Sequence, residues 1–229
     1  MRVKILPAVL ALVASTALAA CGSTPTDPSS STPVTFTQTV PVPTTTVPTP
    51  TSTSYIGPQG LAIETGPFLA AAATTPLGRV IDGIQCQPLR QFAYRLYVHL
   101  QVYVGGRSRA LPGGIGLVDP TAVAGNKGLL FSPQACYYWL HTRAADGLVQ
   151  VESPKDRRYT LGDFFKVWGQ ALSRERVAAS RGRVTAIVDG RRWTRDPAAI
   201  PLREHESIEL AVGRPVPRFQ AVDWTSTAY

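Results

Sequence analysis

The side chains best suited to chemistry in this sequence are two histidines and a glutamate: His99, His141 and Glu152. Neutral imidazole nitrogens and a carboxylate oxygen are ligands that Zn²⁺ and Cu²⁺ accept. If the strands that carry them lie side by side, the three residues could form a metal site, and this is one prediction. The other interpretation is that they are separate surface or hydrogen-bonded residues.

Three further polar side chains accompany these positions. They are Arg95, Arg143 and Gln150, each two or four residues from one of the candidate metal ligands. Guanidinium groups beside imidazoles can hold an anion through charge-assisted hydrogen bonds. The sequence therefore also predicts ligand binding by these three residues.

Catalytic motifs give no comparable signal. The sequence has three histidines and contains no Gly-x-Ser-x-Gly, His-Glu-x-x-His, Walker or Cys-x-x-Cys motif. We predict no catalytic residue, and we expect a non-catalytic binding or structural domain rather than an enzyme. An envelope hydrolase that uses His99 is the alternative.

The elements that position these side chains are mainly strands. Residues 92–104 alternate between two faces over thirteen positions, which is typical of a half-buried strand. Gly105-Gly106 predicts a turn into a partner strand at 108–111. Further strands are expected at 136–141, 148–152, 183–188, 191–193 and 207–212.

One helix interrupts the strands. Thr160-Leu161-Gly162-Asp163 resembles a capping box, and the apolar spacing after it predicts a helix that ends near Gly169. A further helical turn is expected around 173–179. Together these elements predict an α+β fold, a single mainly antiparallel β domain over 56–229 with one or two short helices.

Residues 1–20 predict export. A short basic start precedes a mostly apolar run that is too short to span a bilayer, the proportions of a signal peptide. The Leu-Ala-Ala-Cys that ends at Cys21 resembles the bacterial lipobox. This resemblance implies cleavage before Cys21, transfer of a diacylglycerol to its thiol, and fatty acylation (palmitate, for example) of its new amino group. An ordinary secreted protein is the alternative.

Two or more acyl chains give stable attachment, so we expect a lipid-anchored protein of the cell envelope. In a cell with two membranes we expect the periplasmic side of the outer membrane, because Gly22-Ser23 lacks the aspartate that often signals inner-membrane retention. Residues 21–55 predict a disordered tether, since 18 of the 34 residues from Gly22 to Tyr55 are Ser or Thr and 7 are Pro. Whether this tether is O-glycosylated stays open.

The charge balance points to an anionic partner. Residues 56–229 carry 21 Lys and Arg and 14 Asp and Glu, a net charge of +7. An exported domain without a long basic run is not expected to bind nucleic acid. Its positive surface is better suited to anionic envelope polymers or lipids.

Two cysteines remain once Cys21 is lipidated. Cys86 and Cys136 form an even pair in an oxidising compartment, which predicts a disulfide that closes a loop of about fifty residues. Reduced buried thiols or thiolate metal ligands are the alternatives.

Residues 81–212 resemble an uncharacterised bacterial exported domain. The likeness is carried by Tyr-Arg-Leu-Tyr-Val-His-Leu from Tyr94, Trp-Leu-His-Thr-Arg from Trp139, Gly-Leu-Val-Gln-Val-Glu-Ser-Pro from Gly147 and Thr-Leu-Gly-Asp-Phe-Phe-Lys-Val-Trp-Gly from Thr160. The domain's histidine-rich pattern implies a metal site in its members and no particular reaction. Four of its histidine positions are occupied differently in this chain, by Arg95, Tyr97, Arg143 and Gln150. These departures would weaken a metal site or replace it with contacts to an anion or another ligand.

Overall fold

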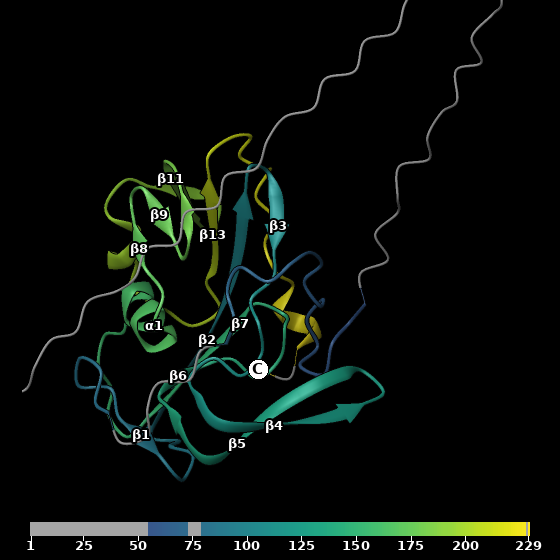
Figure 1. Cartoon of the computed structure of the whole chain (residues 1–229), viewed down its shortest axis with the longest axis vertical. Coiled ribbons are helices and arrows are strands. Elements are labelled where there is room, and N and C mark those ends of the chain that lie inside the picture. The colour runs from purple at the N-terminus through teal and green to yellow at the C-terminus, as the bar shows by residue number, and fades with distance from the viewer. Residues whose placement is uncertain (1–54, 73–78, 228) are drawn as a thin grey trace, which may run out of the picture. The chain divides into compact units, whose positions relative to one another are not determined.

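The computed structural model describes residues 55–72, 79–227 and 229 (Figure 1). The predicted signal peptide, Cys21 and all of the predicted tether except Tyr55 lie outside these residues. A seven-stranded sheet with the order β12-β11-β13-β2-β7-β6, to which β3 is added by pairing with β2, forms the centre. Its strands are β2 (Tyr94–Val104), β3 (Arg107–Arg109), β6 (Leu140–His141), β7 (Leu148–Ser153), β11 (Val184–Val188), β12 (Arg191–Trp193) and β13 (Ser207–Val212).

The long strand β2 lies in the middle of this sheet. One edge pairs in parallel with β13, and the other pairs in antiparallel fashion first with β7 and then with β3. The predicted alternation is confirmed, since Leu96, Val98, Leu100 and Val102 are all buried in the main core. The strand begins at Tyr94, later than predicted, and Phe92 is 58% exposed.

The predicted helix is confirmed as α1 (Leu161–Trp168). The side chain of Thr160 accepts from the backbone N–H of Asp163, whose carboxylate accepts from the backbone N–H of Thr160 in return. Gly169 ends the helix in the left-handed conformation, at φ 73°. The helix buries aromatic side chains, among them Phe164 and Trp168, in the same core as the apolar face of the sheet.

Two smaller sheets complete the strands. In one, the hairpin of β4 (Leu117–Gly125) and β5 (Gly128–Tyr138) takes β1 (Cys86–Gln87) as a third strand, and Figure 1 shows the hairpin as a long arm. The other consists of β8 (Leu172–Ser173), β9 (Arg176–Val177) and β10 (Ser180–Arg181). Two 3₁₀ turns are present, η1 (Pro197–Ala199) and η2 (Trp224–Ser226). Sequence analysis assigned no element to most of the β4–β5 hairpin, and the expected strand at 136–141 is the end of β5 followed by β6.

The helical turn expected around 173–179 is wrong. Residues 172–181 instead form β8, β9 and β10, which pair through two successive tight turns. Backbone hydrogen bonds cross between strands, as from the N–H of Ala178 to the carbonyl of Ala171 at 2.8 Å. The positions are good helix formers by composition, but burial of Val177 and Ala178 in the core overrides that weak preference.

The predicted disulfide is present between Cys86 and Cys136, with Cα atoms 5.5 Å apart. It links β1 to β5, at neighbouring positions of their antiparallel pairing. With one α-helix among the described residues and mostly antiparallel pairing, the predicted α+β fold class is confirmed.

Candidate functional site

Five of the six polar residues predicted to gather in a cleft share one face of the central sheet. The strand pairing places Arg95 opposite Glu152 and His141 opposite Gln150, and His99 lies on the same face of β2 as Arg95. Residues two apart on a strand point to the same side, so this polar face lies opposite the main core. The pairing of β2, β7 and β6 therefore places these five positions on one face of the sheet.

The sixth residue, Arg143, interacts with a different element. Its Nε donates to the carbonyl of Phe131 at 3.1 Å and its Nη2 donates to the hydroxyl of Ser132 at 3.0 Å. Both partners belong to β5. These contacts hold the guanidinium against the β4–β5 hairpin.

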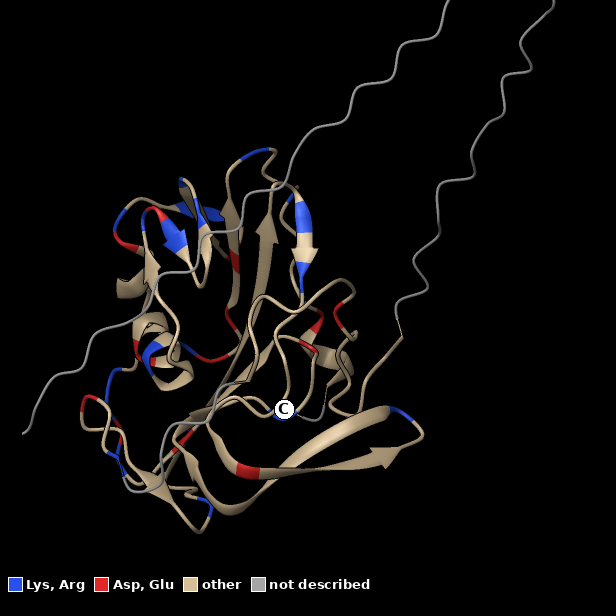
Figure 2. Ribbon diagram, in the orientation of Figure 1, with Lys and Arg blue, Asp and Glu red and all other residues tan. Residues whose placement is uncertain are grey.

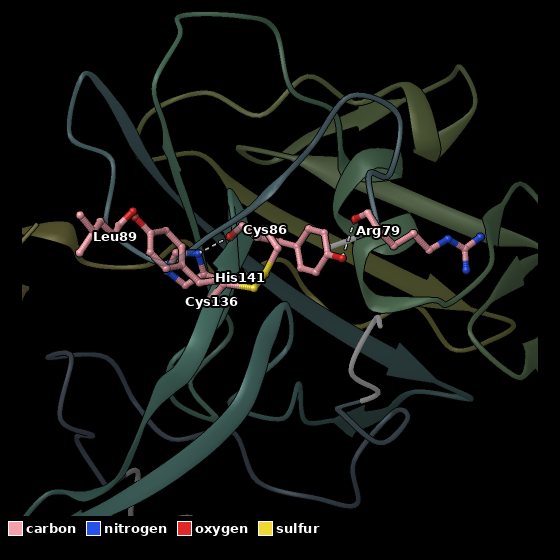
Figure 3. Close-up of a disulfide and its surroundings, with 7 residues drawn as sticks. Arg79, Cys86, Leu89, Cys136 and His141 are labelled. Carbon is pink, nitrogen blue, oxygen red and sulfur yellow. Dashed lines mark hydrogen bonds between the residues drawn. A yellow bond between two sulfur atoms is a disulfide. The ribbon is translucent and has the colours of Figure 1, made fainter. Parts of the chain in front are cut away.

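His141 is buried beside the disulfide (Figure 3). Its Nδ1 lies 3.0 Å from the carbonyl of Tyr138, and the ring of Tyr137 meets it edge-on at 5.3 Å between centroids. Burial lowers the pKa of His141 to about 4, against the opposing effect of the nearby Glu152. The imidazole is therefore neutral at pH 7.

Gln150 and Glu152 are both buried on β7. The carboxylate of Glu152 is held by Arg90, a residue that sequence analysis did not single out. By contrast, neither amide atom of Gln150 has a hydrogen-bond partner among the described residues. Leaving a buried amide without a partner costs about 1–3 kcal/mol of folding free energy.

His99 lines a cavity of about 410 Å³ between the polar face of the sheet and the segments near the two ends of the described chain. Burial lowers its pKa to about 4, against a hydrogen bond to the backbone of Asp146. His99 pairs with Leu148 of β7, and His141 pairs with Gln150 of the same strand. The two histidines are therefore separated by two strand spacings and by two residues along the strand, which places their Cα atoms roughly 12 Å apart. Within residues 55–72, 79–227 and 229, no group of three His, Cys, Asp or Glu side chains is arranged to hold a metal ion. Metal binding by His99, His141 and Glu152 remains a prediction.

A second hollow, of about 970 Å³, lies where the small β8–β10 sheet meets the edge hairpin β11–β12. Among its lining residues Glu175 is the single acid. We call this hollow the arginine groove after the six arginines that line it, Arg174, Arg176, Arg181, Arg183, Arg192 and Arg195. Figure 2 shows Lys and Arg gathered around these short strands.

Several of these arginines are held in place without being neutralised. Arg176 donates from Nε to the carbonyl of Ala178 at 2.7 Å, and Arg174 donates from Nη2 to the carbonyl of Thr194 at 3.3 Å. The guanidinium of Arg195 lies 5.8 Å from the ring centroid of Trp193. In the part of the chain that the structure describes, no groove arginine forms an ion pair.

The basic surface continues around the edge of the sheet. A further hollow of about 460 Å³ is lined by Arg183, Arg192 and Arg214, so it shares two arginines with the groove. Alternate residues of β11 line the two hollows. Val184 and Ala186 line the groove, and Thr185 and Ile187 line the further hollow. Both faces of the edge hairpin are therefore basic.

No known family model, curated protein or solved structure matches this chain. Its chemistry must therefore be inferred from its own residues. Among the described residues, no helix is both long and apolar enough to cross a bilayer.

Sequence analysis did not predict the arginine groove. It considered the net charge of the domain and not the spacing of the groove arginines. Arg174 and Arg176, and likewise Arg181 and Arg183, are two residues apart, a spacing that puts side chains on one face of a strand. That signal was readable, but the expected helical turn at 173–179 would have placed the arginines on different sides.

Proposed function

We propose that this protein is an exported, lipid-anchored protein of the cell envelope whose globular domain binds an anionic envelope polymer along the arginine groove. The observation that carries the proposal is the groove itself, six arginines around one acidic residue. Arginine presents a planar fork of N–H donors that matches phosphate, sulfate and carboxylate groups.

The absence of internal neutralisation supports a role in binding. Five of the six arginines are exposed, and in the described residues none pairs with a carboxylate. Six like charges around one hollow repel one another and destabilise the fold. A polyanion that enters the groove replaces this repulsion with charge-assisted hydrogen bonds.

A polymer fits this surface better than a single small anion. Arg183 and Arg192 belong to both hollows, so the basic surface runs from one face of the edge hairpin to the other. An extended chain with a charge on each repeat unit can contact both hollows at once. A small anion would occupy one of them and leave the other arginines unpaired.

The proposed location supplies such a polymer. Lipidation at Cys21 and the Ser-, Thr- and Pro-rich residues after it would hold the domain near the membrane surface. The anchored domain would link the membrane to the polymer, and this role requires no catalytic residue.

The test compares binding of the purified chain to dextran sulfate with binding to uncharged dextran of the same length. Fluorescence anisotropy measures the binding at several salt concentrations. The pair of polymers shares one backbone and differs in charge. We expect binding to dextran sulfate alone, and an affinity that falls steeply with salt as counterions compete.

The groove variant is Arg183→Gln/Arg192→Gln, and its matched control is Arg107→Gln/Arg109→Gln on β3, which lines neither hollow. Both variants remove two charges. A loss of about tenfold or more in the groove variant, with less than twofold in the control, would support the proposal. Equal losses would show that net charge alone is responsible, and binding of uncharged dextran would refute an electrostatic groove.

A further inference from the structure

The cavity of about 410 Å³ on the polar face of the sheet lies apart from the arginine groove and shares none of its lining residues. Its floor is the sheet, with His99, Gln101 and Tyr103 of β2 and Glu209 of β13. The segment 56–65 and the segment 220–226 form its other walls. This volume suits a small organic molecule.

Two acidic residues from different elements line this cavity. Glu209 is 2% exposed, lines the cavity, and its Oε1 has no hydrogen-bond partner among the described residues. Glu64 accepts the backbone N–H of Leu111 on Oε2 at 2.5 Å, and its Oε1 likewise lacks a partner there.

The lining of the cavity is acidic, whereas the protein as a whole is basic. Asp223 adds a third carboxyl, and no Lys or Arg is among the lining residues. Burial raises the pKa of Glu209, as expected for a carboxyl without a cation beside it. Leaving a buried acceptor unpartnered costs about 1–3 kcal/mol, which a donor-bearing cation would recover.

We infer that this cavity is a binding site for a small aliphatic ammonium compound, with Glu209 and Glu64 accepting hydrogen bonds from its ammonium groups. The unpartnered oxygens come from two different walls, which favours a compound with an amine at each end. Apolar residues also line the cavity, among them Leu61, Ile63 and Val222, and their side chains suit an alkyl chain. The hydroxyl of Ser108 already accepts a hydrogen bond from Gln101 at 3.0 Å, so these two polar groups are satisfied without a ligand.

The test is calorimetry of the full chain with three linear compounds of equal length: 1,5-diaminopentane, 1,5-pentanediol and pentanedioate. They match in end-to-end length, and their end groups change from cationic to neutral to anionic. We expect the diamine to bind with millimolar affinity or better, and the diol and the dianion to bind at least tenfold more weakly.

Two variants locate the site. Glu209→Gln keeps the shape of the side chain and removes the carboxylate, and we expect it to weaken diamine binding at least tenfold. Asp156→Asn, an exposed position that does not line the cavity, is the control and should leave affinity unchanged. Thermal unfolding of each variant shows that it is folded.

Several outcomes would overturn the inference. One is the absence of any diamine binding at a diamine concentration of about 10 mM. The others are binding of the dianion as tight as that of the diamine, and an unchanged affinity for the diamine in Glu209→Gln. Binding of Zn²⁺ that depends on Glu209, with no amine bound, would assign the cavity to a metal instead.

Discussion

Arg90 holds Glu152 through both carboxylate oxygens. Its Nε donates to Oε2 at 2.9 Å, and its Nη2 donates to Oε1. The side chain of Glu152 is completely buried, whereas that of Arg90 is 44% exposed. Glu152 was predicted as a metal ligand, and in the structure a guanidinium occupies the place that a cation would take. A metal ion at Glu152 would have to displace Arg90.

Replacing Arg90 with glutamine should destabilise the fold, because it leaves a buried carboxylate without its partner. We expect a loss of about 2–3 kcal/mol in the free energy of unfolding, below the usual 3–5 for a fully buried pair because Arg90 is partly in water. Urea denaturation at pH 7 measures the loss. The double variant Arg90→Gln/Glu152→Gln should recover most of it, and a double variant as unstable as the single one would show that Arg90 acts through packing alone.

The disulfide should contribute substantially to stability. Cys86 and Cys136 are 50 residues apart in sequence, and closing a loop of that size restricts the unfolded chain by about 4 kcal/mol. Cys86→Ala/Cys136→Ala should therefore melt at a clearly lower temperature than the wild type. A reducing agent should lower the wild-type melting temperature toward that of the variant and leave the variant unaffected. A wild type that is insensitive to reduction would contradict this expectation.

Asp146 should make the protein less stable as the pH rises from about 4, near its unfolded pKa, to about 7, its folded pKa. It is fully buried, Oδ2 has no hydrogen-bond partner among the described residues, and burial raises the pKa from 3.8 to about 7. A folded-state pKa above the unfolded value gives stability that is present at low pH and lost as the pH rises through about 7. Between pH 6.5 and 8 the wild type should lose about 1 kcal/mol to this group.

The range from pH 6.5 to 8 separates the effect of Asp146 on stability from that of the buried histidines. His99 and His141, whose pKa values are lowered to about 4, cost stability only as the pH falls below 6.5. Asp146→Asn should flatten the slope between pH 6.5 and 8. Denaturation at four pH values measures the slope. A slope as steep in Asp146→Asn as in Asp156→Asn would show that another group titrates.

Cys21→Ser tests the proposed anchor in the living cell. Without the thiol no diacylglycerol can be attached, so the protein should move from the detergent phase to the aqueous phase in phase partitioning. Mass spectrometry of the wild-type N-terminus should find a lipid-modified Cys21. An unmodified N-terminus, or a wild type recovered in the aqueous phase, would remove lipidation from the proposed function.

Local pattern was sufficient for much of the fold. The alternation along β2, the paired strands predicted at 183–188 and 191–193 and the capping box at Thr160 each depend on neighbours within a few residues, and each is confirmed. Residues 172–181 show where such reasoning stops. Their local preference is helical, but the buried Val177 makes the chain turn twice within ten residues.

The sequence by itself determined that the domain is basic and which residues along β2 and β7 share a strand face, and it predicted the disulfide between Cys86 and Cys136 that the structure shows. Only the tertiary structure decided which faces meet. The partner of Glu152 is 62 residues away, and Glu64 and Glu209 come to one cavity from segments near opposite ends of the described chain. Backbone periodicity reaches only a few residues along the chain, whereas burial, charge pairing and cavity shape depend on atoms that the fold brings together from far apart.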